Sequence, residues 1–129
     1  MCSDRGQREA ETGLRRLSVL VVEDDETVRQ LYASLLAHSG YDVEMANDGE
    51  AGWAALVKGQ FDLVVTDHNM PKLTGVELVA RMRNAGMTVP VIIASGAKPQ
   101  GTEGLKVAAI VQKPFSATEF LKLVEEVIE

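Results

Sequence analysis

The chain has 129 residues, enough for one domain with a hydrophobic core and too few for two domains of ordinary size. Its formal net charge of −6 disfavours direct binding to nucleic acid or to anionic membranes. One cysteine and two histidines exclude a disulfide framework and argue against a zinc site. No apolar run reaches the ~20 residues that span a bilayer, so we expect a cytoplasmic protein without membrane insertion.

Short apolar runs alternate with amphipathic stretches from Leu17 onward, whereas residues 1–16 are polar, carry both signs of charge and show no apolar periodicity. We therefore expect a flexible leader or linker over residues 1–16 and one domain over residues 17–129. Five runs have the length of strands, and most of them are nearly continuous in apolar residues, as expected for a parallel sheet with helices on both faces. These runs are 17–22, 41–46, 61–66, 89–94 and 107–112.

Several stretches between and after these runs carry helix signals. Apolar residues recur at helical spacing from Val28 to Leu36, and Gly40 marks the end of this first helix. Asn47 or Asp48 is placed to cap a second helix. Two later helices begin with capping boxes, formed by Thr74 with Glu77 and by Ser116 with Glu119. The alternation predicts an α/β domain with an open parallel sheet and helices on both faces.

The stretch between Ser95 and Lys113 opposes a regular helix because it contains Pro99, Gly101 and Gly104. In a helix interior, proline costs ~3 kcal/mol and glycine ~1 kcal/mol relative to alanine. We therefore predict that the fourth helix of the domain is short, distorted or absent.

Polar and charged side chains stand at the carboxyl ends of four predicted strands. Glu23 and Asp24 follow the first strand, Asp67 the third, Ser95 the fourth and Lys113 the fifth. In an open parallel sheet these ends lie along one edge, where binding sites form. The acidic run EDDE alone indicates only a helix N-terminus, because the helix dipole stabilises acids there. Its combination with the other residues predicts a functional site.

The residue types at this edge fit phosphoryl transfer. Converging carboxylates repel one another unless a cation neutralises them, and an all-oxygen set of two or three carboxylates favours Mg²⁺. A metal with open positions can hold a phosphoryl group, while a lysine and a serine hydroxyl contact the other phosphoryl oxygens. An aspartate can itself act as the nucleophile and form an aspartyl-phosphate.

Four segments carry a family resemblance: VLVVEDDE, TDHNMPKLTG, VIIASG and VQKPF. In this order and spacing they resemble the receiver domain of two-component response regulators, over residues 17–129. The resemblance implies a doubly wound sheet of five parallel strands in the order 2-1-3-4-5. It also implies a cis peptide bond between Lys113 and Pro114.

The resemblance further implies that Glu23, Asp24 and Asp67 bind Mg²⁺ together with the backbone carbonyl of Asn69. Asp67 is then the residue that accepts a phosphoryl group, and the donor is a histidine kinase or a histidine phosphotransfer protein. We therefore expect a signalling module that catalyses its own phosphorylation and dephosphorylation, and not an enzyme that acts on a separate metabolite.

In the same resemblance, Ser95 is the switch hydroxyl and Lys113 is the lysine that pairs with the phosphate. Phosphorylation would bias the loops after the fourth and fifth strands between two arrangements, and so control a partner or an attached domain. The family usually has an aromatic switch residue on the fifth strand, where this chain has Ile110. Because Ile110 lacks a ring and the fourth helix is interrupted, we expect signalling through another surface, such as the first helix.

Three other functions fit parts of the pattern. A pseudo-receiver scaffold would use the same fold without phosphorylation. A small phosphatase of the haloacid dehalogenase type requires a second aspartate two residues after the nucleophile, where this chain has Asn69. A nucleotide or flavin module requires a phosphate loop rich in glycine or hydroxyl groups after the first strand, where this chain has EDDE.

Overall fold

The computed structural model describes residues 16–128, so residues 1–15 of the predicted leader and residue 129 lie outside the described range. Five parallel strands form one sheet in the order β2-β1-β3-β4-β5, as predicted. The strands are β1 (Ser18–Val22), β2 (Asp42–Ala46), β3 (Leu63–Asp67), β4 (Val91–Ser95) and β5 (Ala109–Gln112). Every residue of β1, β3 and β4 is buried, which agrees with their nearly continuous apolar sequences.

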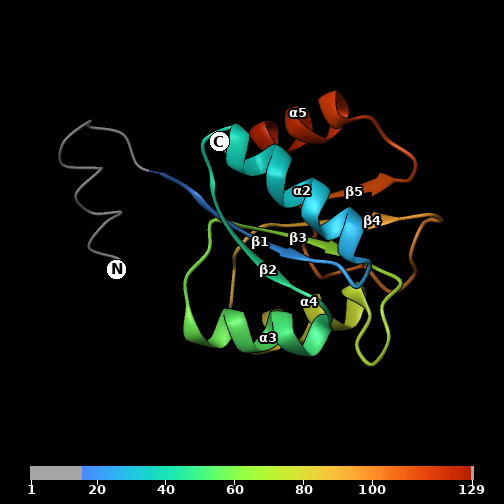
Figure 1. Cartoon of the computed structure of the whole chain (residues 1–129). Coiled ribbons are helices and arrows are strands. Elements are labelled where there is room, and N and C mark those ends of the chain that lie inside the picture. Colours follow the sequence, from blue (N-terminus) through green and yellow to red (C-terminus); the bar gives the residue numbers. More distant parts are fainter. Residues whose placement is uncertain (1–15, 129) are drawn as a thin grey trace.

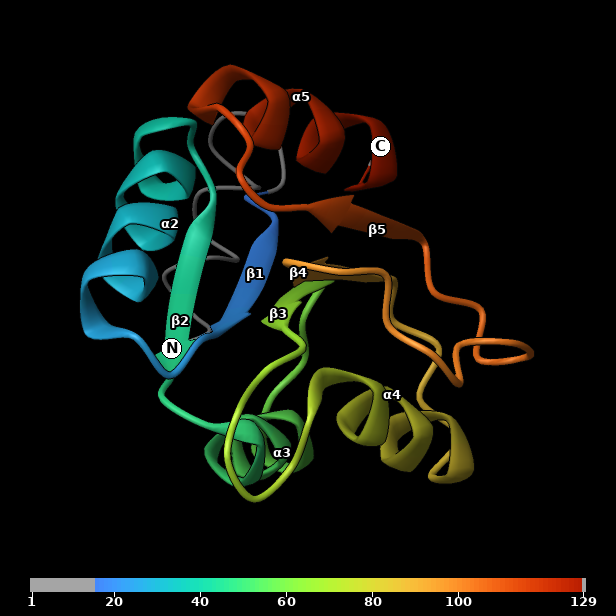
Figure 2. The ribbon, with the colours of Figure 1, turned by 90° about the vertical axis from the view of Figure 1, so that its right-hand side faces the viewer.

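Helices cover both faces of the sheet and complete a three-layer α/β domain (Figure 1, Figure 2). One face carries α2 (Glu26–His38) and α5 (Ala117–Ile128), and the other carries α3 (Gly49–Lys58) and α4 (Gly75–Asn84). Each pair of helices packs on its own apolar cluster. Phe120 of α5 belongs to the cluster under α2 and α5, and Leu78 of α4 belongs to the cluster under α3 and α4. None of the described helices is long and apolar enough to cross a membrane.

Each helix begins at a capping residue close to the carboxyl edge of the sheet. At the start of α2, Asp25 Oδ1 accepts a hydrogen bond from the Val28 N–H at 3.0 Å, and at the start of α3, Asp48 Oδ1 accepts one from the Ala51 N–H at 2.7 Å. Both predicted capping boxes form, with Thr74 and Glu77 before α4 and with Ser116 and Glu119 before α5. These caps fix the loops that carry the predicted site.

The connection from β4 to β5 contains no helix in the described chain, which confirms the prediction for this segment. Gly101 and Gly104 have φ angles of 81° and 80°, in the left-handed region that glycine adopts without strain. Farther along, Leu105 and Val107 pack against the apolar cluster on the α3/α4 face. The segment therefore crosses this face as an irregular chain that still contributes apolar contacts.

Arg83, in the last turn of α4, holds the irregular segment by its backbone. Its Nε–H donates to the Leu105 carbonyl at 2.8 Å and its Nη2 to the Lys106 carbonyl at 3.2 Å. Its Nη1 donates to the carbonyls of Met87 and Val89, in the connection from α4 to β4, at 3.0 and 2.9 Å. One guanidinium group therefore ties two connections together where a helix is lacking.

The lack of a helix leaves one side of β5 open. Ile110 pairs in register with Ile93, which is fully buried in the cluster on the α3/α4 face. Paired residues of parallel strands point to the same face, so Ile110 points away from α2 and α5. Ile110 is 37% exposed. The residue at the family's usual aromatic switch position thus lies partly at the surface.

Replacing Arg83 by methionine should loosen this segment selectively. The variant keeps an aliphatic stem but leaves four carbonyls without their donor, so the free energy of unfolding should fall by about 1–3 kcal/mol. Amide hydrogen exchange should accelerate over residues 97–106 and stay unchanged in β1. Arg81→Met is the matched control, because Arg81 forms an ion pair with Glu50 that is largely open to solvent. Equal exchange over residues 97–106 in both variants would contradict this role of Arg83.

Candidate functional site

Three carboxylates converge at the carboxyl ends of β1 and β3. Glu23 and Asp24 directly follow β1, and Asp67 is the last residue of β3. The two strands are neighbours, with Val22 paired to Thr66. One oxygen atom from each of the three side chains lies within 4.8 Å of the other two. Glu23 and Asp67 are buried and Asp24 is exposed, so solvent reaches the cluster from the side of Asp24.

Hydrogen bonds of the loop hold Glu23 in this position. Its N–H donates to the Ala46 carbonyl at the end of β2 at 3.1 Å, and its Oε2 accepts the Asp25 N–H at 3.1 Å. The guanidinium of Arg29, in the first turn of α2, donates to the Glu23 carbonyl at 2.9 Å. Arg29 was not among the predicted site residues, although a basic residue in the first turn of a helix is close enough to reach the preceding loop.

The chain turns sharply after Asp67, and Gly75 makes this turn possible. The Gly75 N–H donates to the His68 carbonyl at 3.1 Å. A Cβ atom at position 75 would lie 2.6 Å from the Asp67 carbonyl oxygen and 3.0 Å from the His68 Cα. A side chain there would push the loop away from the strand end. Glycine is therefore required by a close backbone approach.

Lys113 reaches the acids from the end of β5. Its Nζ lies 2.6 Å from Asp67 Oδ1 and 3.6 Å from Glu23 Oε1. Its backbone N–H donates to the Ser95 carbonyl at 2.8 Å, and its peptide bond to Pro114 is cis, as the resemblance implied. One ammonium group therefore offsets part of the negative charge of three carboxylates.

Burial of Glu23 disfavours the charged form of its carboxyl group. Burial raises the pKa of this carboxyl group to about 7; the hydrogen bond from the Asp25 N–H opposes the shift, and the charge of Asp67 adds to it. Burial by itself would lower the pKa of Lys113, but the hydrogen bond to Asp67 and the neighbouring negative charges outweigh it, so this pKa is raised.

One oxygen of the cluster lacks a hydrogen-bond donor. Glu23 Oε1 is buried and accepts no hydrogen bond from the residues that the structure describes. It stands beside two further carboxylates, so the donor set consists of oxygen atoms alone. Oxygen donors and an unsatisfied buried carboxylate fit a hard divalent cation such as Mg²⁺.

Ser95 and Asn69 occupy the loops next to the acids. Ser95 ends β4 and is buried, and its hydroxyl donates to the Ala97 carbonyl and accepts the Ala97 N–H within its own loop. Asn69 is exposed two residues after Asp67. The structure thus brings the three carboxylates and Lys113 together, whereas the roles assigned to Ser95 and Asn69 stay predictions.

A family model for the response regulator receiver domain matches residues 19–125. The chain belongs to this receiver domain family. It is therefore a signalling module of the two-component type and not an enzyme that acts on a separate metabolite, as predicted. Membership argues against the phosphatase and the nucleotide or flavin module, and the cluster of Glu23, Asp24 and Asp67 is consistent with a phosphorylatable aspartate site.

Receivers of known name or structure resemble the chain over most of its length. It is 37% identical to the transcriptional regulatory protein DltR of Streptococcus agalactiae over 110 residues, which are 81% of this chain and 49% of DltR. The chain spans about half the length of the curated relatives that it matches first. The structure of Vibrio cholerae chemotaxis protein CheY4 is similar with a TM-score of 0.81 at 30% identity, over 87% of this chain and 98% of that one. Response regulator TrrA of Thermotoga maritima, solved in complex with Mg²⁺-BeF, is similar with a TM-score of 0.77 at 25% identity, over 86% of this chain and 98% of that one.

The raised pKa of Glu23 predicts how the receiver responds to pH when a chelator removes divalent cations. This pKa is about 7 in the folded chain against an ordinary 4.5, so the folded chain holds a proton on Glu23 more tightly than the unfolded chain does. The contribution of Glu23 to the free energy of unfolding is therefore fully present below pH 4.5 and is lost as the pH rises through 7. From about pH 5 to about pH 8 the free energy of unfolding should therefore fall by on the order of 2 kcal/mol.

Substitution of Glu23 isolates this effect. Glu23→Gln should remove the fall in stability, whereas Glu26→Gln, at an exposed acid of the first turn of α2, should retain it. Denaturant unfolding at the two pH values measures both variants against wild type. A fall of the wild-type size in Glu23→Gln would show that another group is responsible.

Proposed function

We propose that Asp67 accepts a phosphoryl group in a Mg²⁺-dependent reaction, and that the phosphorylated domain changes conformation to control a partner or an attached domain. The observation that carries this proposal is the meeting of Asp67 with two further carboxylates and the Lys113 ammonium. A structural ion pair would need only one acid for one lysine. The excess of acids and the unsatisfied oxygen of Glu23 indicate a place for a cation.

Glu23, Asp24 and Asp67 would hold the cation through carboxylate oxygens, and Asn69 would add its backbone carbonyl. When bound, Mg²⁺ supplies positive charge that offsets the charge of the phosphoryl oxygens. The choice of Mg²⁺ is supported by the oxygen-only donor set and by TrrA, which was solved in complex with Mg²⁺-BeF.

The residues of the chain have separate roles in the transfer. One carboxylate oxygen of Asp67 attacks the phosphorus atom, the bond from phosphorus to the donor's histidine nitrogen breaks, and its electron pair returns to the imidazole. Lys113, already 2.6 Å from Asp67 Oδ1, then pairs with a phosphoryl oxygen. Ser95 exchanges its hydrogen bond to Ala97 for one to another phosphoryl oxygen. These exchanges bias the loops after β4 and β5.

The donor that fits this chemistry is a histidine kinase or a histidine phosphotransfer protein, because phosphohistidine offers a labile P–N bond. Family membership implies such a partner, and we place the transfer in the cytoplasm, where kinases have access to ATP. With a net charge of −6 the chain is poorly suited to contact nucleic acid itself. Its output therefore passes through a protein partner or an attached domain.

Phosphorylation by small donors tests the proposal. Wild-type protein incubated with Mg²⁺ and acetyl phosphate, or with phosphoramidate as a donor with a P–N bond, should gain one phosphoryl group by intact-protein mass spectrometry. Asp67→Asn should gain none, and a chelator should prevent the gain in wild type. Asp25→Asn is the control, because asparagine can still cap α2. Equal labelling of wild type and Asp67→Asn would overturn the mechanism, and unlabelled wild type would favour the pseudo-receiver scaffold.

A further inference from the structure

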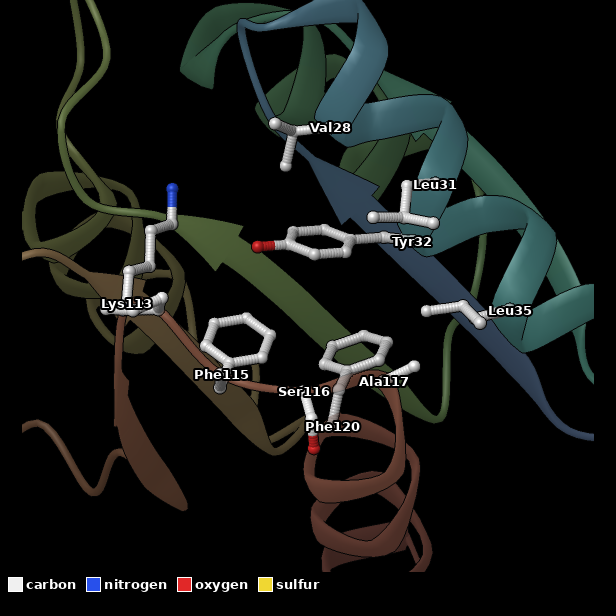
Figure 3. A pocket seen from close by; sticks show the side chains of 10 residues that line it. Val28, Leu31, Tyr32, Leu35, Lys113, Phe115, Ser116, Ala117 and Phe120 are labelled. Carbon is white, nitrogen blue, oxygen red and sulfur yellow. The ribbon is translucent and has the colours of Figure 1, made fainter.

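An apolar groove of about 280 Å³ lies between α2 and the connection from β5 to α5 (Figure 3). Val28 and Leu35 line it from α2, and Phe115 lines it from the opposite side. Lys113 also lines the groove, while its ammonium group is hydrogen-bonded to Asp67. The groove and the acidic cluster are therefore joined through one side chain.

Tyr32 stands on the groove side of this junction. It is 5% exposed, and its ring is stacked on those of Phe120 and Phe115, with centroid distances of 4.9 and 5.9 Å. Phe115 and Phe120 are stacked on each other at 5.8 Å. The stack fixes the direction of the tyrosine, whose hydroxyl points toward the side of the groove where Lys113 stands (Figure 3).

The Tyr32 hydroxyl lies in the electric field of the acidic cluster. Burial raises the pKa of Tyr32, the Lys113 ammonium opposes this shift, and the charges of Glu23 and Asp67 add to it. A lysine ammonium has three N–H donors. Asp67 Oδ1 accepts one of them at 2.6 Å, whereas Glu23 Oε1 at 3.6 Å is too distant to accept a hydrogen bond, so donors remain for an acceptor on the α2 side.

We propose that Tyr32 is a positioning residue of the phosphorylation site: its hydroxyl steadies the Lys113 ammonium from the α2 side, and its ring transmits the position of that ammonium to Phe115 and Phe120. This inference rests on the proposed phosphorylation of Asp67. When the ammonium moves from the carboxylate to a phosphoryl oxygen, the hydroxyl faces a changed partner, and the stacked rings along the groove adjust.

Tyr32 on α2 would thus supply the aromatic group that is missing from the switch position on β5. Ile110 has no hydroxyl, and it points to the face of the sheet opposite Tyr32. Lys113, by contrast, lines the same groove as Tyr32. Because coupling between two sites is reciprocal, the contents of the groove and the state of Asp67 influence each other equally.

Binding of beryllofluoride, used as a mimic of the phosphoryl group, tests the hydroxyl. With saturating Mg²⁺, Tyr32→Phe should bind beryllofluoride about threefold to tenfold more weakly than wild type, because the Lys113 ammonium loses a polar neighbour on the α2 side. Both proteins should have the same affinity for Mg²⁺ alone. A general structural defect would instead weaken Mg²⁺ binding as well. Tyr41→Phe is the matched control, because it removes the same atom next to the amino end of β2. Isothermal titration calorimetry measures the affinity of each of the three proteins for both ligands.

The outcomes separate this inference from the function on which it rests. Equal beryllofluoride affinity in wild type and Tyr32→Phe would overturn the positioning role and leave phosphorylation of Asp67 standing. Wild type that binds no beryllofluoride would overturn both.

Fluorine NMR tests the ring stack. Protein labelled with 4-fluorophenylalanine carries labels at Phe61, Phe115 and Phe120. Adding beryllofluoride to the Mg²⁺-saturated wild type should shift the resonances of Phe115 and Phe120 but not that of Phe61, which packs on the opposite face of the sheet. The Phe120 shift should be lost in Tyr32→Leu. Unshifted Phe115 and Phe120 in wild type that binds beryllofluoride would overturn the coupling.

Discussion

Repulsion among three carboxylates, offset only in part by one ammonium group, is the constraint on which the carboxyl edge of the sheet depends. Glu23 and Asp24 directly follow β1 and Asp67 ends β3, so the pairing between these two strands holds the three residues close together. The other contacts of the edge limit this repulsion, through the charge of Lys113 and through the N–H of Asp25. A divalent cation bound at this edge would therefore relieve repulsion that the groups of the protein offset only in part.

Much of this edge could be predicted because the carboxyl ends of parallel strands converge. The runs before Glu23, Asp67 and Lys113 have sequences suited to burial on both faces, so their ends could be located and placed together. The orientation of a loop side chain could not be predicted in the same way. Ser95 ends β4 as expected, but its hydroxyl donates a hydrogen bond to the Ala97 carbonyl in its own loop. The residue type alone does not determine whether a serine hydroxyl bonds to a local or a distant partner.

Local and tertiary effects explain which other features were predictable. The lack of a helix before β5 follows from Gly101 and Gly104, because helix propensity is a property of the segment itself. The roles of Arg83 and Tyr32 depend on segments far away in the sequence. Apolar periodicity places the ring of Tyr32 in the core but says nothing of what surrounds its hydroxyl, and the four carbonyls bound by Arg83 are brought together only by the fold.

The clamp formed by Arg83 also affects how this domain can diverge. The guanidinium binds carbonyl oxygens, which every amino acid provides, so it holds the chain at Leu105 and Lys106 without selecting the side chains between Lys98 and Gly104. A helix in the same place would require apolar residues at regular spacing on the face that meets the sheet. Exposed positions of the connection between β4 and β5, such as Lys98 and Gln100, are thus free to vary while Gly101 and Gly104 keep their turns, and new recognition surfaces can arise there by substitution alone.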